Sequence, residues 1–173
     1  EEYWYKDNIR FYSSHLKVSY TVKDYVAVEE AQPSATRAKT PNLELRVKNL
    51  LPQTDFDNRA HGDKVTYNPE FEFNTEDGDF YSYFHIMRHA ADSDVLFELV
   101  DRDIDEVIHT LALSDFLAKF DEIDVTKQEV LIPIEVVFKN LSVEVTIPDW
   151  MINDLTPGFG NDNGNEPDED NNN

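Results

Sequence analysis

Apolar and polar residues alternate with a period of two along most of the chain, which is typical of half-buried β-strands. Such runs lie at residues 16–22, 43–47, 130–138 and 143–147, and further strands are expected at 95–100 and 106–113. Segment 80–87 is rich in aromatic residues and apolar on nearly both faces, and the alternating run 65–73 is broken by Pro69. The pattern therefore predicts a protein built mainly of short strands.

Turn and cap signals connect these strands. The strands at 95–100 and 106–113 flank a short acidic segment, which predicts a β-hairpin. A change of parity around Lys139 and Asn140 predicts a second, final hairpin. One short helix is expected at 115–120, with Ser114 as its N-cap and Asp115 near the positive end of its dipole.

Many short strands with a single short helix predict an all-β fold, an immunoglobulin-like β-sandwich of about seven or eight strands. A β-barrel would give a similar pattern, and the sequence leaves that alternative open. The length of 173 residues fits one domain, expected at 1–156. Residues 157–173 are rich in Asn and acids, which predicts a flexible tail or linker.

Charge narrows the class of partner. The formal net charge is −21, and outside residues 154–173, which hold six of the 36 acids and no base, 30 acids still face 15 bases. A surface of this sign repels phosphate backbones and anionic headgroups, so nucleic-acid binding and peripheral membrane binding are disfavoured. Any membrane attachment is expected through a lipid anchor or export signal outside this chain.

Catalytic motifs do not stand out in the sequence. The chain has no Cys, which excludes disulfides, thiolate metal sites and Cys nucleophiles. It also contains no G-x-S-x-G elbow and no Gly-rich phosphate loop. The sequence therefore predicts a protein that is not an enzyme and needs no cofactor, apart from a possible calcium ion.

The calcium candidate is the acidic segment between two predicted strands. Asp101, Asp103 and Asp105 have the D-x-D-x-D spacing that opens a calcium loop, and Glu106 follows them. An EF-hand would have Gly at the sixth position and Glu at the twelfth, where this chain has Glu106 and Ala112. An acidic hairpin turn explains the same residues and is the favoured interpretation.

Two further groups of residues could bind a ligand. His85 and His89 have the spacing of a zinc pair on a helix, but four residues along a strand span about 13 Å, so a strand there argues against a shared metal. Tyr3, Trp4 and Tyr5 could stack on sugar rings as exposed aromatic side chains. Packing in a core or a domain interface explains these aromatic residues more simply.

The order of elements in the second half resembles a known family. It consists of an aromatic strand at 80–88, a strand at 95–99, an acidic turn, the segment 107–117 with its short Leu-rich helix, a hairpin after 128–131, and a final strand ending at Trp150. This order resembles the carboxyl-terminal domain of the fimbrillin and minor fimbrial anchor proteins of type V pili in Bacteroidia. The resemblance covers residues 43–150.

The resemblance implies transthyretin-like sandwich domains, export as a lipoprotein to the cell surface, and assembly with other fimbrial subunits by strand exchange. The residues that fit this mechanism are the alternating first strand, Leu16, Val18, Tyr20 and Val22, as a donated or displaceable strand, and Arg37 in the following loop as a protease site. An ordinary first strand with a surface loop explains the same residues. The expected function is a non-catalytic structural or adhesive domain, with a glycan-binding module and a calcium-stabilised adhesin domain as alternatives.

Overall fold

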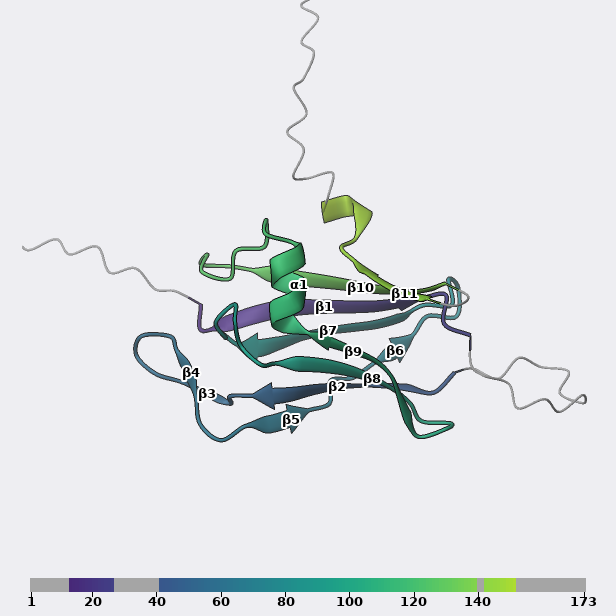
Figure 1. Cartoon of the computed structure of the whole chain (residues 1–173), viewed down its shortest axis with the longest axis horizontal. Coiled ribbons are helices and arrows are strands. Elements are labelled where there is room, and N and C mark those ends of the chain that lie inside the picture. Colours follow the sequence, from purple (N-terminus) through teal and green to yellow (C-terminus); the bar gives the residue numbers. More distant parts are fainter. Residues whose placement is uncertain (1–12, 27–40, 140–141, 152–173) are drawn as a thin grey trace, which may run out of the picture.

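The computed structural model describes residues 13–26, 41–139 and 142–151 (Figure 1). Within these residues it contains eleven strands, the helix α1 and a short helical turn at residues 149–151. In chain order the strands and α1 are β1 (His15–Lys23), β2 (Leu43–Leu50), β3 (Gln53–Thr54), β4 (Ala60–His61), β5 (Val65–Tyr67), β6 (Glu72–Phe73), β7 (Phe80–Met87), β8 (Leu96–Asp101), β9 (Glu106–Ala112), α1 (Leu113–Lys119), β10 (Leu131–Lys139) and β11 (Ser142–Thr146).

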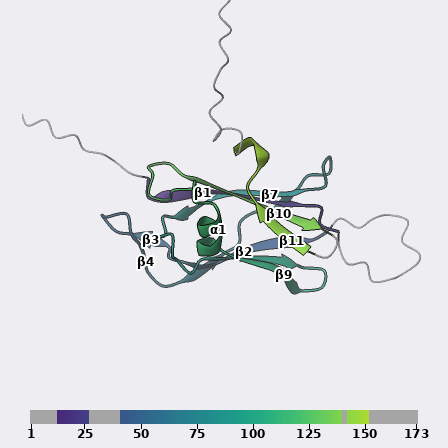
Figure 2. The same ribbon diagram turned by 45° about the horizontal axis from the view of Figure 1, so that its top comes forward.

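Nine of these strands form two stacked sheets, so the predicted sandwich is confirmed. The first sheet has the order β11-β10-β1-β7-β6 and the second has the order β5-β2-β8-β9. Figure 2 shows them as two layers with α1 at the gap between them. Strand β1 pairs in parallel with β10, and the other described pairings are antiparallel. β3 and β4 form a small separate hairpin.

The two-residue alternation produces the core directly. Every second side chain of β1, β2 and β8 points between the sheets, and rings from opposite layers meet there: Tyr20 of β1 lies 5.8 Å from Phe97 of β8. Twenty-five buried apolar residues form one continuous cluster in the described part of the chain. At about 1.5–3 kcal/mol for each large apolar side chain buried, this cluster is the main source of stability.

Pro69 marks the point where the chain changes sheets. The run 65–73 divides into β5, which pairs with β2, and β6, which pairs with β7 in the other sheet. Pro69 lacks a backbone N–H and cannot continue a ladder, which explains why the strand stops there. Phe71 then enters the core, with its ring 5.3 Å from that of Phe80.

Both predicted hairpins are confirmed, because β8 pairs with β9 and β10 with β11. Residues 140 and 141 at the tip of the second hairpin lie outside the described residues. The predicted helix is present, but its N-cap is Ala112 and no side chain caps it, so the prediction for Ser114 is wrong. The physical reason is that the N–H of Leu113 donates to the carbonyl of Val95, which leads the ladder straight into the helix.

The prediction that segment 80–87 is apolar on nearly both faces is also wrong. Strand β7 alternates between buried and exposed residues, with Phe80, Phe84 and Ile86 in the core. Tyr83 and His85 instead face solvent on the outer side of the sheet. The aromatic content of this strand is therefore divided between the core and an exposed surface.

Candidate functional site

The acidic turn between β8 and β9 is held by its own hydrogen bonds. Asp101 is only 2% exposed; it accepts a hydrogen bond from the Tyr25 hydroxyl and another, of 2.8 Å, from the Asp103 backbone N–H. Burial and the bond to Asp101 raise the pKa of Tyr25, which keeps its hydroxyl protonated as a donor. Arg102 neutralises part of the charge, with its guanidinium 3.2 Å from Asp105.

This arrangement bears on the calcium candidate. In the described residues, no three His, Cys, Asp or Glu side chains are grouped so that they could hold a metal ion. The structure thus does not bring Asp101, Asp103, Asp105 and Glu106 together as ligands. Asp101 instead joins the end of β8 to the segment after β1 through Tyr25, and the turn is a structural link between the two sheets.

The first strand lies at the centre of its sheet. Leu16, Val18, Tyr20 and Val22 are all fully buried, and the strand pairs with β7 on one side and β10 on the other. The position therefore matches an ordinary, well-packed strand, and it does not test displacement by a partner. Arg37 lies outside the described residues.

His85 and His89, the two histidines with zinc-pair spacing, lie in different environments. His85 is exposed on β7, with its ring 5.6 Å from the ring of Tyr83 in an edge-to-face arrangement. His89 is buried, and its Nε2 accepts a hydrogen bond of 3.0 Å from the Leu51 N–H while its Nδ1 donates to the carbonyl of Met87 at 2.7 Å. Both ring nitrogens of His89 are thus engaged in hydrogen bonds, and His89 is a structural residue.

Exposed aromatic side chains do occur on the outer face of the first sheet. Tyr83 is 61% exposed and Tyr81 is 36% exposed, two positions apart on β7. The Tyr81 hydroxyl donates to Asp77 at 2.8 Å. Period-two spacing of the Tyr residues in 80–87 is the signal that could have found this surface from the sequence. Tyr3, Trp4 and Tyr5, which the sequence offered as candidate stacking residues, lie outside the described residues.

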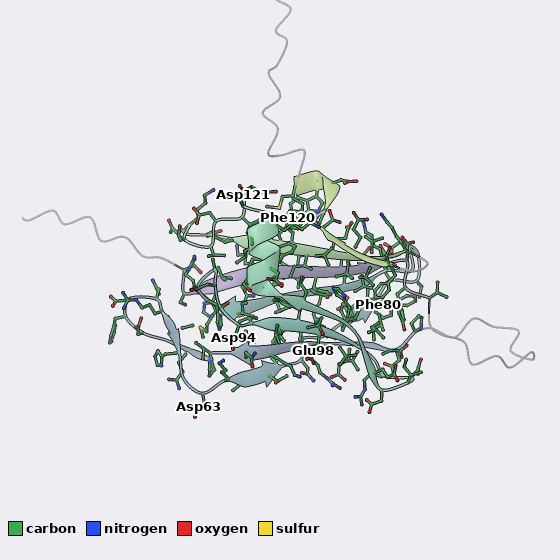
Figure 3. The ribbon with its side chains drawn as sticks, viewed as in Figure 1. Asp63, Phe80, Asp94, Glu98, Phe120 and Asp121 are labelled. Atoms are coloured by element: carbon green, nitrogen blue, oxygen red, sulfur yellow. The ribbon has the colours of Figure 1, made fainter. Side chains whose placement is uncertain are left out.

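A hollow of about 700 Å³ lies at the end of the sandwich where β7 finishes. It is lined by residues of the β3–β4 hairpin, the β7–β8 connection and the segment before β10, among them Arg59, Ala91 and Thr126. Asp94, labelled in Figure 3, also lines it and forms an ion pair with Lys64.

Arg88, which also lines this hollow, is held by structural hydrogen bonds. Arg88 donates hydrogen bonds to the backbone carbonyls of Ser13, Val125 and Gln128. Desolvation lowers the pKa of Arg88, but a guanidinium stays charged at any physiological pH. Arg88 therefore ties three chain segments together and acts as a structural residue.

The described residues offer sheet edges and loops for contact. The described part of the chain also contains no helix long and apolar enough to span a bilayer. Asp101, His89 and Arg88 are all engaged in hydrogen bonds that hold segments of the sandwich together. Contact with other molecules falls to its outer face and its edges.

Comparison with known proteins gives one family match. Residues 5–156 match the model of the family described as fimbrillin-A associated anchor proteins Mfa1 and Mfa2. This match confirms the resemblance drawn from residues 43–150. No protein with a curated description matches the sequence significantly.

Several solved structures are similar to the chain. Three of them are the fimbrial anchor protein Mfa2 from Porphyromonas gingivalis (12% identity, 78% of this chain and 45% of that chain, TM-score 0.49), a candidate adhesin from Bacteroides ovatus (14%, 80% and 49%, 0.55), and a candidate polysaccharide-binding protein from Bacteroides thetaiotaomicron (13%, 72% and 43%, 0.50). At these identities the likeness to the second and third structures, with TM-scores of 0.55 and 0.50, supports the fold alone. The chain spans about half the length of the structures it matches.

Proposed function

The chain belongs to the family of fimbrillin-A associated anchor proteins, and from this premise we propose that it is a non-catalytic structural domain of a fimbrial subunit at the cell surface. The family match over residues 5–156 is the observation that carries the proposal. A sandwich in which the buried side chains of Asp101 and His89 are engaged in structural hydrogen bonds suits a protein that acts by contact. Its partners are then other fimbrial subunits or ligands on cell surfaces.

The finer part of the proposal is assembly by β-strand complementation. In this mode a strand from one subunit completes the sheet of another through main-chain hydrogen bonds, and its alternate side chains fill pockets. Strand β1 has the required pattern, because Leu16, Val18, Tyr20 and Val22 are buried at every second position. Cleavage at Arg37, between β1 and β2 in the sequence, would leave β1 held by non-covalent contacts alone and free to be exchanged.

Immunogold electron microscopy of cells that assemble such fimbriae tests the structural role. With an antibody against this chain, gold is expected on the fimbriae or at their base. Gold spread over the cell surface away from fimbriae would reject the proposal. Limited trypsin digestion of the native full chain tests the processing step separately, because resistance of Arg37 and Lys39 to cleavage would exclude it.

Glycan binding is a second candidate function, supported by the exposed Tyr81 and Tyr83 on the outer face of the first sheet. Exposed aromatic rings supply a large apolar area on which a sugar face can stack. A glycan array with the full chain and with Tyr83→Ala tests this candidate. Retention on an immobilised glycan should fall in the variant, and unchanged retention would exclude Tyr83 as a stacking residue.

A further inference from the structure

Strand β7 has a neighbour along its whole length on one side but along only two residues on the other. All eight residues of β7 pair with β1 in regular antiparallel register. On the other side, β6 pairs with Tyr81 and Phe80 alone. Within the described residues, the stretch 82–87 therefore has no strand beside it on that side.

Two backbone hydrogen bonds show which backbone groups of β7 this leaves unpaired. The N–H of Arg88 donates to the carbonyl of Ser14 at 2.8 Å, so even-numbered residues of β7 point their backbone groups toward β1. The carbonyl of Asp79 accepts from the Asn74 N–H at 2.8 Å, so odd-numbered residues point toward the β6 side. The N–H and C=O groups of Tyr83 and His85 consequently face the side without a strand.

Edge strands in soluble proteins are usually blunted by short length, bulges, Pro or charged residues, because unpaired backbone groups attract other strands. The other described edges follow this rule. β6 has two residues, β5 has three and an irregular register, β9 has a register shift, and β11 carries Glu144. Residues 81–87 include no Lys, Pro, Gly, Asp or Glu.

We propose that the β7 edge at Tyr83 and His85 binds an extended segment of a partner polypeptide, which adds to the first sheet in line with β6. The inference rests on the proposed function, in which the domain acts by contact. The added strand would form up to four main-chain hydrogen bonds with these two residues, whose N–H groups donate and whose carbonyls accept. Apolar side chains on its inner face would lie near Tyr67, whose ring packs 5.9 Å from Phe84 and remains 43% exposed.

Charge favours a cationic partner segment over a second copy of this chain. The chain carries a net charge of −21, and the exposed side chains of Glu70 and Glu72 lie beside the end of the unpaired stretch. Pairing two copies along this edge would bring like charges together, which is destabilising. A strand with Lys or Arg at its outward positions complements the same surface.

Amide hydrogen exchange of the full chain, followed by NMR, tests the edge directly. The amides of Tyr83 and His85 should exchange quickly, whereas those of Phe84 and Ile86, bonded to β1, should be protected. Addition of an acetylated, amidated peptide of alternating Lys and Val should slow exchange at Tyr83 and His85 by at least about ten-fold. Protection of these two amides in the free protein, or no change on adding the peptide, would overturn the proposal.

His85→Pro is the blocking variant, because it removes an N–H that no ladder bond to β1 uses. It should abolish peptide binding, while the matched control His85→Thr retains both the N–H and the binding. The peptide N-methylated on its pairing side should also fail to bind, which keeps the test valid if Pro unfolds the protein. Binding that persists with the methylated peptide would contradict the proposal. It would also be contradicted if the unmodified protein forms a homodimer that the His85→Pro variant does not form.

Loss of peptide binding is independent of the proposed fimbrial role. The position of gold label on fimbriae does not depend on the peptide, so the two experiments can fail separately. If gold marks the fimbriae and the peptide does not bind, only the β7 edge is rejected.

Discussion

The two long sides of the sandwich are closed in different ways. On the β9–β10 side, α1 contributes the buried residues Leu113, Phe116 and Leu117 to the core, and Lys119 bonds the carbonyl of Val145 on β11. On the β5–β7 side, the half-exposed ring of Tyr67 covers Phe84, and β7 keeps an unpaired edge. Figure 2 shows α1 at the first side, between the two layers.

The difference separates stability from contact within one fold. The side with α1 is sealed by a segment that follows directly from β9, so its apolar surface is removed from water at small entropic cost. The opposite side combines an incomplete strand with exposed rings, and this is where a partner can add hydrogen bonds and apolar contact. One sandwich thus has a side that stabilises it and a side that is available for assembly.

The largest effect is expected from removing the aromatic ring that seals the first side. Phe116→Ala should lower the free energy of unfolding by about 3–5 kcal/mol, because the ring is 1% exposed and leaves a cavity. The matched change on the other side, Tyr67→Ala, should cost about 1–2 kcal/mol, because that ring is already 43% exposed. Urea denaturation measures both, and equal losses would contradict the difference between the sides.

A smaller effect is expected from pH. His89 joins the two sheets at the end of the sandwich where β7 finishes, since its ring bonds both the carbonyl of Met87 and the N–H of Leu51 after β2, and burial lowers its pKa below the usual range. The unfolded chain therefore takes up a proton first as the pH falls, so the stability that neutral His89 provides is present above about pH 6.5 and is lost below it.

Urea denaturation at pH 7.5 and pH 5.5 should show this loss. His89→Gln keeps a donor and an acceptor but does not titrate, so its stability should vary less over this range than that of the wild type. His109 on β9 also has its pKa lowered by burial, so it contributes the same pH dependence to the wild type and to His89→Gln. Equal pH dependence in His89→Gln and the wild type would show that His89 does not titrate with folding.

The sequence predicts the sandwich because alternation reports burial directly, as in Leu16 to Val22. It does not predict which strands are central, because that depends on pairings distant in the chain, such as β1 with β10. The roles of His89 and Asp101 were missed for the same reason. Their partners, Leu51 and Tyr25, lie 38 and 76 residues away. The β7 edge follows from the shortness of β6, which no local pattern in 80–87 encodes.

The smallest effect is expected at the start of α1. If Ser114 were the N-cap, Ser114→Ala would cost about 1 kcal/mol. In the structure the helix begins at Leu113, whose N–H is bonded to the carbonyl of Val95 on the way into β8. We therefore expect Ser114→Ala to change the unfolding free energy by less than about 0.5 kcal/mol.

Ser114→Gly is the control for this position, since Gly inside a helix should cost about 1 kcal/mol relative to Ala. The two variants can be compared by their urea midpoints. A loss of about 1 kcal/mol in Ser114→Ala would mean that the Ser114 hydroxyl caps the helix after all. The side closed by α1 would then depend on a local helix cap as well as on the backbone ladder from β9 into the helix. Its difference from the β7 side would in that case come from the buried aromatic rings alone.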